Sequence, residues 1–501
     1  MEQVVIAADS ESVTFGELDR LSDRIAGALA ASGIGRGERI ALLAPNGPEF
    51  AAAYLGILKA GAVVVPVNVL LNPHEVDFIL KDAAAVALVY HPVLDETVAA
   101  LESKALMRLV AGLGGSDWAS LIEHDHAPPA LELDPQTDLA ALLYTSGTTG
   151  HPKGAMLTHR NLVSNTFSIM RALCLEPGRD RLLVVLPMFH AFAATVGLLT
   201  PLLHGLSLVA VARFEPGAVA AAIARHGATV FLGVPSMYNL LLRLGDEPGE
   251  ALRGLRFCVS GGAALPGEVR ERFEARFGVP VHEGDGPTEC SPVTCVNPMD
   301  GPRRNGSVGV PVPGVEMRIA DEGGRTLADG EVGEICVRGP NVMTGYWGQP
   351  EATRESFFGD WFRTGDLGYR EPDGYFYMVD RKKDLIIVNG MNVYPRVVEE
   401  VLYTHPWVRE VAVVGEPHKL HGEIPVAYVA LSEAGAVDGP ALRGFCQEYL
   451  GRYEIPRHIY LVDELPKSAA GKILKRALRR QGELERGVDH SVDAQLQRRE
   501  A

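Results

Sequence analysis

The residues with the clearest chemical potential form a glycine- and hydroxyl-rich stretch that follows an apolar run at residues 139–143. The stretch reads Tyr144-Thr145-Ser146-Gly147-Thr148-Thr149-Gly150-His151-Pro152-Lys153-Gly154. Glycines let backbone amides approach phosphate oxygens, hydroxyls donate hydrogen bonds to them, and Lys153 adds a cation. The pattern differs from a P-loop, because Gly154 stands where a serine or threonine would bind magnesium. It predicts a strand that leads into a phosphate-binding loop.

Six further motifs follow. They are Leu186-Pro187-Met188-Phe189-His190, Ser260-Gly261-Gly262-Ala263, Gly286-Pro287-Thr288-Glu289, Trp361-Phe362-Arg363-Thr364-Gly365-Asp366, residues 381–390, and Pro466-Lys467-Ser468-Ala469-Ala470-Gly471-Lys472. In this order the motifs resemble those of the adenylate-forming superfamily, which holds acyl-CoA synthetases, nonribosomal-peptide adenylation domains and beetle luciferases. The resemblance covers nearly the whole chain and is strongest to free-standing fatty-acid or carboxylic-acid CoA ligases.

This resemblance implies an ATP site with Mg²⁺. Thr288 would contact the α-phosphate, and Glu289 and Thr145 would bind the metal, since Mg²⁺ takes one or two carboxylates together with nucleotide phosphates. Asp366 offers two oxygens to the ribose hydroxyls, and Arg381 offers a rigid fork of donors. The implied ATP- and AMP-binding residues are Thr145, Ser146, Gly147, Thr148, Thr149, Gly150, Lys153, Gly262, Ala263, Asp285, Gly286, Thr288, Asp366, Arg381 and Lys472.

The implied catalytic residues are Lys472, Glu289 and Thr288. Lys472 follows Gly471 on a short polar loop, where a mobile lysine could offset negative charge on the α-phosphate during its attack. Outside the family context, a lysine beside Lys475 and Arg476 would be read as part of a basic helix face.

One residue departs from the family pattern. The superfamily usually places an aromatic residue before the Gly-x-Thr-Glu step, and this chain has Asp285 there. An aromatic ring could stack on adenine, whereas an aspartate cannot. Either adenine packs on other surfaces or the affinity for the nucleotide is lower.

The acyl pocket is expected to be mainly apolar, which predicts a substrate acid with an apolar tail. Amino-acid adenylation domains carry an aspartate directly after the pocket phenylalanine, but here His190 follows Phe189, which argues against an amino-acid substrate. No arginine stands among these positions to bind a second carboxylate, which weighs against malonate. His190 is read equally well as a pocket wall or as a core histidine. The candidate pocket residues are Phe189, His190, Phe192, Val234, Met237 and Gly261.

Two loops near the C-terminus are implied to serve one active site in turn. The loop with Lys472 is needed for adenylation, and the loop with Gly390 and Met391 is implied to guide the pantetheine thiol of CoA. Both loops are not expected in one cleft together, so a rigid rotation about a hinge at Lys383 is expected.

The sequence pattern of the elements that must position these residues predicts an α/β fold. Thr14 and Glu17 form a capping-box pattern, and buried β-branched runs alternate with helical periods up to about residue 298. Examples are a strand expected at residues 257–260 and a helix expected at residues 267–277. Short alternating strands then predict a small antiparallel barrel, followed by a new α+β pattern. We expect a large N-terminal domain of doubly wound sheets plus the β-barrel over residues 1–382, a small mobile α+β domain over residues 383–480, and a charged tail over residues 481–501.

The amino-acid composition argues against several classes of function and partner. Lys and Arg total 47 against 63 Asp and Glu, a net charge of −16, which argues against a nucleic-acid or anionic-membrane partner. No apolar run is long enough to span a bilayer. The six cysteines lack any C-x-x-C pair, which favours a reducing cytoplasm.

The sequence therefore predicts a cytoplasmic ATP-dependent acyl-CoA synthetase that works through an acyl-adenylate, with ATP and CoA as co-substrates and Mg²⁺ as cofactor. The expected partners are an acid with an apolar tail, ATP and CoA, and a homodimer is one expected assembly. Two alternatives stay open: an acyl-AMP ligase that loads a carrier protein in trans, and a non-enzymatic nucleotide- or acyl-binding homologue.

Overall fold

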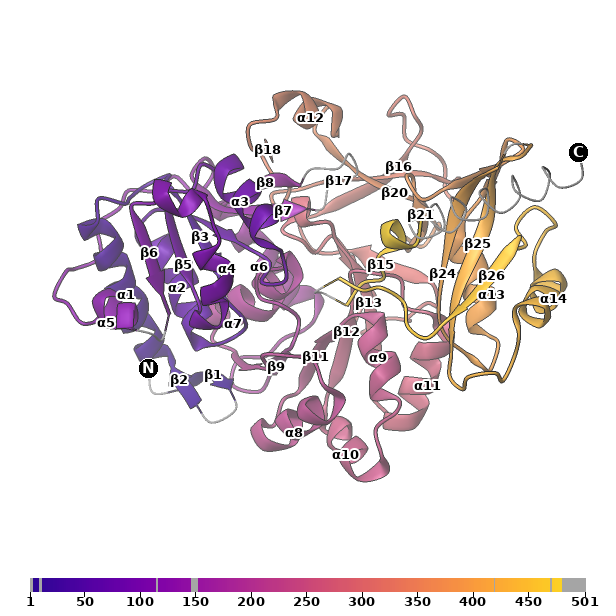
Figure 1. The fold of residues 1–501 in the computed structure, drawn as a ribbon, viewed down its shortest axis with the longest axis horizontal. Coiled ribbons are helices and arrows are strands. Elements are labelled where there is room, and N and C mark those ends of the chain that lie inside the picture. The colour runs from indigo at the N-terminus through magenta and orange to yellow at the C-terminus, as the bar shows by residue number, and fades with distance from the viewer. Residues whose placement is uncertain are drawn as a thin grey trace, which may run out of the picture.

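The structure is a computed structural model that describes residues 3–8, 11–113, 116–145, 152–418, 420–468 and 471–479. These residues form three sheets with helices packed around them (Figure 1). Among them, no helix is long and apolar enough to cross a membrane. The predicted α/β class is confirmed.

The first sheet has seven strands with a parallel centre. In spatial order they are β18 (Gly345–Tyr346), β8 (Lys153–Thr158), β7 (Leu139–Thr145), β4 (Val63–Pro66), β3 (Arg39–Leu43), β5 (Ala87–Tyr90) and β6 (Leu109–Gly112). From β7 to β6 the strands are parallel, and β8 and β18 extend one edge antiparallel. The central strands are continuous apolar runs, because a parallel sheet is buried on both faces.

The second sheet has fourteen strands. Its path is β16 (Glu316–Ala320), β17 (Gly333–Arg338), β20 (Trp361–Arg370), β21 (Phe376–Arg381), β15 (Ser307–Pro311), β14 (Cys295–Val296), β13 (Val281–Asp285), β12 (Phe257–Ser260), β11 (Val230–Gly233), β9 (Arg181–Val184), β10 (Ser207–Ala210), β1 (Val4–Ala8) and β2 (Glu11–Thr14), with β19 (Phe357–Phe358) beside β20. The strands from β13 to β1 are parallel, and those from β13 to β16 are antiparallel. The antiparallel strands predicted after residue 298 are thus present, joined to the parallel ones through β14 and β15.

Helices cover these two sheets. They are α1 (Phe15–Ala31), α2 (Pro48–Lys59), α3 (Pro73–Asp82), α4 (Asp95–Ala99), α5 (Ser116–Ile122), α6 (His159–Ala172), α7 (Thr200–His204), α8 (Pro216–His226), α9 (Pro235–Leu241), α10 (Asp246–Glu250), α11 (Gly267–Phe277) and α12 (Pro350–Glu355), with short helices η1 (Pro92–Leu94), η2 (Ser103–Leu106), η3 (Ala193–Leu199), η4 (Ala251–Gly254) and η5 (Thr288–Cys290). The predicted capping box of α1 is confirmed. Thr14 Oγ1 accepts the Glu17 N–H at 3.2 Å, and Glu17 accepts the Thr14 N–H at 2.8 Å.

The third sheet belongs to the C-terminal part of the chain. Its strands are β23 (Met391–Val393), β22 (Ile386–Val388), β25 (Gly422–Leu431) and β24 (Val408–His418), with β26 (His458–Val462) parallel to β25. Helices α13 (Pro395–Tyr403) and α14 (Gly439–Tyr449) cover one face. Leu465 and Leu478 pack on the other face, against Tyr428 and its neighbours.

Several candidate residues stand at the carboxyl ends of parallel strands in the first and second sheets. Thr145 ends β7, Ser260 ends β12, and Asp285 ends β13. In open α/β sheets, ligands bind beyond these strand ends. The predicted motifs therefore lie where this architecture places a site.

Candidate active site

The predicted phosphate loop joins two paired strands. Thr145 at the end of β7 lies opposite Lys153 at the start of β8, while Ser146, Gly147, Thr148, Thr149 and Gly150 lie outside the described residues. The base of the loop is anchored, because the Tyr144 hydroxyl donates to Asp82 Oδ2 at 2.6 Å. A Cβ added to Gly154 would lie 3.1 Å from the Tyr144 ring, so glycine allows the strands to pair closely.

Tyr346 connects this loop to the candidate metal ligand. Its hydroxyl donates to Glu289 Oε1 at 2.8 Å, and Lys153 Nζ lies 5.2 Å from the centre of its ring. Burial and the charge of Glu289 raise the pKa of Tyr346, which keeps the phenol protonated as a donor. Glu289 is held in place further by its backbone oxygen, which accepts the Met343 N–H at 2.7 Å. Tyr346 was not predicted from the sequence.

The residues near Glu289 fit Mg²⁺ that is shared with a nucleotide. Among the described residues, no three His, Cys, Asp or Glu side chains gather as a protein-only metal site. Magnesium needs no such cage, because it takes one or two carboxylates and fills its other positions with phosphate oxygens and water. Glu289 would supply the carboxylate, and the Thr145 hydroxyl stands at the base of the neighbouring loop.

Asp366 and Arg381 meet as directly opposed residues on β20 and β21. Arg381 Nε lies 3.2 Å from Asp366 Oδ1. Burial raises the pKa of the Asp366 carboxyl against the opposing charge of Arg381, and the nearby charges of Asp285 and Glu289 raise it further. The predicted ribose-binding pair is therefore assembled inside an acidic cluster.

Lys472 reaches into this cluster from the C-terminal part of the chain. A Cβ added to Gly262 would lie 2.7 Å from Lys472 Cε and 3.1 Å from its Nζ, so the lysine tip rests on the turn after β12. Burial, followed by the charge of Arg381, lowers the pKa of Lys472 to about 8, while Asp285 and Asp366 act in the opposite direction. The lysine is thus a partly buried cation near the carboxylates of Asp285 and Asp366.

The loop that carries Lys472 is fixed on the large part of the chain. Ser236 Oγ donates to the Gly471 carbonyl at 2.9 Å, and a Cβ added to Gly471 would lie 3.0 Å from Val234 Cγ2. The Lys472 N–H donates to Ser468 Oγ at 3.2 Å within the loop itself. Ser236 is a second anchoring residue that sequence reasoning missed.

Some of the candidate acyl-pocket residues lie near the lysine tip, among them His190 and Val234. Burial and the charge of Lys472 lower the pKa of His190 to about 3, so its ring is neutral. The Phe192 N–H donates to His190 Nδ1 at 3.3 Å, which assigns the ring proton to Nε2. A Cβ added to Gly261 would lie 3.3 Å from the Phe192 ring. Val234 and Met237 are buried beside them, and Phe189 packs against the same core.

Asp285 takes part in the acidic cluster. Its carboxyl accepts the Gly286 N–H, and burial raises its pKa while Arg381 and Lys472 lower it. Its backbone carbonyl accepts both the N–H (3.0 Å) and the hydroxyl (2.9 Å) of Thr294. Gly286 must be glycine here, because a Cβ would collide with the Pro292 carbonyl oxygen.

Two predicted residues lie apart from this cluster. Gly390 and Met391 stand at the exposed β22–β23 hairpin, where Met391 is 42% exposed and a Cβ on Gly390 would meet nothing within 4 Å. Lys383 lies in the turn between β21 and β22. The Lys472 loop therefore occupies the site while the Gly390 hairpin faces outward.

Comparison with known proteins identifies this arrangement. A family described as "AMP-binding enzyme" matches residues 1–347, and the "AMP-binding enzyme C-terminal domain" family matches residues 397–472. The chain belongs to the AMP-binding enzyme family. This confirms that the chain is a member of the adenylate-forming superfamily, as its motifs predict. The chain is therefore an enzyme of the acid–thiol ligase class.

The relatives are similar over nearly their full length. A sulfoacetate–CoA ligase of Cupriavidus necator is 41% identical over 95% of this chain and 94% of its own. A feruloyl-CoA synthase of Amycolatopsis is 39% identical, covering 94% of both chains. The crystal structure of ATP-bound MatB from Rhodopseudomonas palustris has a TM-score of 0.90 at 33% identity and covers 96% of both chains. This AMP-binding enzyme thus shares its whole architecture with CoA ligases.

Proposed function

We propose that this AMP-binding enzyme is an ATP-dependent acyl-CoA synthetase that joins a carboxylic acid to CoA through an acyl-adenylate. The observation that carries the proposal is the position of Lys472. Its tip rests on Gly262, between the Asp366–Arg381 pair and the pocket around His190. A cation at that junction can neutralise both reacting anions, which no simple nucleotide binder requires.

In the first half-reaction, a carboxylate oxygen of the acid attacks the α-phosphorus of ATP. The bond to the bridging oxygen breaks, and pyrophosphate leaves. Lys472 would offset charge on the carboxylate and the α-phosphate, and Thr288 would donate to the same phosphate. Glu289 would hold Mg²⁺ with Thr145, and this ion supplies a Lewis acid for the phosphate oxygens.

The other residues position the nucleotide. Asp366 and Arg381 would bind the ribose, and the loop from Thr145 to Lys153 would hold the β- and γ-phosphates. The adenine would lie along Gly262, Ala263 and Gly286. With Asp285 in place of an aromatic ring, adenine gains no stacking surface from that position.

In the second half-reaction, the CoA thiolate attacks the acyl carbonyl carbon. The acyl–oxygen bond breaks, and AMP leaves. We propose that residues 383–480 move as a small domain on residues 1–382, with Lys383 as the hinge and residues 481–501 as a tail. Rotation would withdraw Lys472 and bring the Gly390–Met391 hairpin to the site.

The candidate acyl-pocket residues favour an acid whose tail is apolar and uncharged. His190 is neutral, and the residues beside it are Phe192, Val234 and Met237. The Cupriavidus relative is named for sulfoacetate, whose second anion would need a cation that these pocket residues lack. The Amycolatopsis relative is named for feruloyl-CoA, an aromatic acyl group that suits such walls better.

A cytoplasmic location and a homodimer also belong to this proposal. The six cysteines are all free thiols, and five of them are buried, as expected of a protein kept in a reducing compartment. Sedimentation of the purified chain distinguishes a dimer from a monomer.

Pyrophosphate release tests the proposal. The enzyme is incubated with ATP, Mg²⁺ and single acids from acetate to palmitate, together with benzoates, first without and then with CoA. We expect acid-dependent pyrophosphate release, strongest with an apolar acid, and an acyl-CoA product by mass spectrometry. Pyrophosphate without a thioester would indicate a carrier-protein acceptor instead, and the absence of acid-dependent release would indicate a binding protein.

A further inference from the structure

One asparagine joins the first sheet to the second beside the candidate acyl pocket. Asn46 lies three residues beyond the carboxyl end of β3, just before α2. Its side chain reaches the second sheet, where Nδ2 donates to the Leu186 carbonyl at 3.0 Å and to the Val211 carbonyl at 3.2 Å. Its Oδ1 accepts the Met188 N–H at 2.7 Å. The side chain thus uses two donor hydrogens and an acceptor at once, which an amide offers and a hydroxyl does not.

These hydrogen bonds continue the order of the second sheet past the point where its strands stop pairing. The register of β9 and β10 ends at Val184 and Ala210, and Asn46 binds backbone groups just beyond it. Leu186 and Met188 are 2% and 0% exposed. Leaving such a buried backbone group without its partner costs about 1–3 kcal/mol. Asn46 therefore holds the segment that leaves β9 in one place.

The segment that Asn46 holds leads directly to His190. The turn is closed by the His190 N–H, which donates to the Pro187 carbonyl at 2.9 Å, and the His190 carbonyl accepts the Ala194 N–H at 2.9 Å. The charge of Lys472 contributes to the low pKa of His190, so this ring lies near the lysine of the candidate site. The position of His190 thus follows from that of Met188, two residues earlier.

The other end of this connection is on the sheet that carries the candidate phosphate loop. Strands β3 and β7 both pair in parallel with β4, so their carboxyl ends lie on the same edge of the first sheet. Thr145 ends β7, and Asn46 follows β3 on that edge. During adenylation the carboxylate of the acid must meet the α-phosphorus in line, and a misplacement of about 1 Å can cost roughly a hundredfold in rate.

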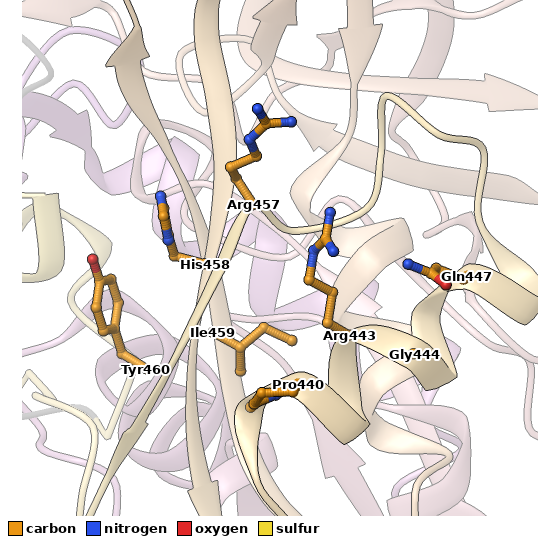
Figure 2. A pocket seen from close by; sticks show the side chains of 9 residues that line it. Pro440, Arg443, Gly444, Gln447, Arg457, His458, Ile459 and Tyr460 are labelled. Atoms are coloured by element: carbon orange, nitrogen blue, oxygen red, sulfur yellow. The ribbon is translucent and has the colours of Figure 1, made fainter.

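Arg443 makes a more local contact of the same chemical kind. Figure 2 shows Arg443 on α14 and Arg457 at the start of β26, beside a groove of about 460 Å³. Arg443 Nε donates to the Pro456 carbonyl at 3.1 Å. That bond joins two neighbouring elements of the C-terminal part of the chain, whereas Asn46 joins two different sheets.

We propose that Asn46 is a positioning residue for adenylation, which fixes residues 186–190 relative to the phosphate loop and so sets where the carboxylate of the acid lies. The inference rests on the proposed acyl-CoA synthetase function. Asn46 acts through the backbone of Leu186 and Met188 and not through contact with a substrate. Its loss should therefore displace the acid and leave the nucleotide in place.

The first test separates the two substrates. Asn46→Ala removes all three hydrogen bonds. Pyrophosphate release is measured against the preferred acid at saturating ATP, and against ATP at saturating acid. We expect the KM for the acid to rise about tenfold and kcat to fall, while the KM for ATP stays within about twofold of the wild-type value.

Asn46→Asp adds a readout in pH. The ionised carboxylate has no donor for the two carbonyls, whereas the protonated form has one O–H donor and still accepts the Met188 N–H. Carbonyl oxygens favour the neutral form, so the pKa of this carboxyl should be raised. The rate of Asn46→Asp relative to the wild type should fall about tenfold between about pH 6 and about pH 8.5. Because asparagine does not titrate, this ratio isolates the substituted side chain from groups common to both proteins.

The same two changes at Asn161 are the matched controls. Asn161 Nδ2 donates to the Pro340 and Val342 carbonyls at 2.8 and 2.9 Å, and its Oδ1 accepts the Thr158 N–H at 2.8 Å. The hydrogen-bonding pattern is therefore the same, on segments other than residues 186–190. These variants should lower the thermal stability without changing the KM for the acid.

Four outcomes would overturn the proposal. They are an unchanged KM for the acid in Asn46→Ala, an equal rise in KM for acid and ATP, an equal rise in the Asn161 variants, and a rate ratio for Asn46→Asp that does not vary with pH. If both Asn46 variants fail to fold while both Asn161 variants fold, Asn46 serves the fold, and the proposal is overturned as well. A failure of the proposed function is seen separately, since the wild type itself would then release no pyrophosphate with any acid.

Discussion

Asp380 Oδ2 accepts the backbone N–H of Arg396 at 2.9 Å, across the turn that contains Lys383. Arg396 is at the start of α13, whose own N-cap residue, Tyr394, makes no side-chain cap. Asp380 therefore caps a helix that lies beyond the proposed hinge. The Arg396 side chain also returns to the Met378 carbonyl at 2.7 Å. These contacts hold the arrangement in which Lys472 is in the site, and a rotation at Lys383 would break them.

Asp380→Ala should lower adenylation more than thioester formation. Loss of a helix cap costs about 1 kcal/mol, which corresponds to roughly a fivefold change in an equilibrium. ATP–pyrophosphate exchange should fall by about that factor relative to thioester formation from synthetic acyl-adenylate and CoA. The control is Asp438→Ala, which removes the side-chain cap on Ala441 of α14, a helix that packs on the third sheet. If both variants shift the ratio equally, Asp380 does not act across the hinge.

Lys472→Ala should abolish adenylation and keep much of the thioester half-reaction. Lys472 is placed to offset charge on the α-phosphate, which matters only while that phosphorus is attacked. We expect exchange to fall at least a hundredfold, with synthetic acyl-adenylate still converted by CoA. Lys467→Ala is a control on the same loop, because Lys467 pairs with Glu410 at 2.7 Å instead. Equal loss of both half-reactions would contradict this role.

The pH dependence of adenylation should have a basic limb near pH 8. The charged form of Lys472 is the active one, and its pKa is lowered to about 8, so the active fraction falls as the pH rises through that value. The profile of kcat/KM for ATP should decline about tenfold per pH unit above pH 8. In Lys472→Arg the guanidinium stays charged, and the limb should move upward. If the wild type and Lys472→Arg show the same basic limb, the limb arises from another titrating group.

Lys383→Pro should slow thioester formation much more than it slows adenylation. The Lys383 N–H donates no hydrogen bond within the described part of the chain, so proline removes none, but it fixes φ at a residue that must rotate. Exchange should stay at a substantial fraction of the wild-type rate, while overall acyl-CoA formation falls steeply. Lys383→Ala serves as the control for the lost charge. Unchanged acyl-CoA formation in the proline variant would rule out this hinge.

Gly262→Ala should displace Lys472. The added Cβ would lie 2.7 Å from Lys472 Cε, at a glycine with φ of +80°. Gly278→Ala is a matched control, since its φ is +70° and nothing lies within 4 Å of the added Cβ. Both variants should lose roughly 1 kcal/mol of stability from the left-handed backbone. Only Gly262→Ala should lose adenylation, by at least tenfold, as measured by ATP–pyrophosphate exchange.

Local patterns predicted much of the fold. The strand at residues 257–260 and the helix at residues 267–277 match β12 and α11, because each is encoded by a short apolar pattern within its own segment. The β22–β23 hairpin and β26 were not predicted. Their runs are short and partly exposed, and β26 is defined by pairing with β25, which is distant along the chain.

The candidate site was predicted from motifs, and the contacts that assemble it were not. Asp366 and Arg381 are motif residues, and the structure pairs them. In contrast, the Tyr346–Glu289 and Ser236–Gly471 hydrogen bonds join segments that meet only after the sheets have packed. A tyrosine or a serine carries no local signal for such a partner, since its role depends on tertiary placement.

The Ser236–Gly471 contact has a consequence for the entropy of catalysis. A free lysine side chain loses up to about 2 kcal/mol of rotamer entropy when it is fixed in one position. Here the backbone next to Lys472 is bound by Ser236, and its tip rests on Gly262, through contacts within the protein itself. That ordering cost falls on the folding of the protein and not on the chemical step, so substrates meet a cation that is already oriented.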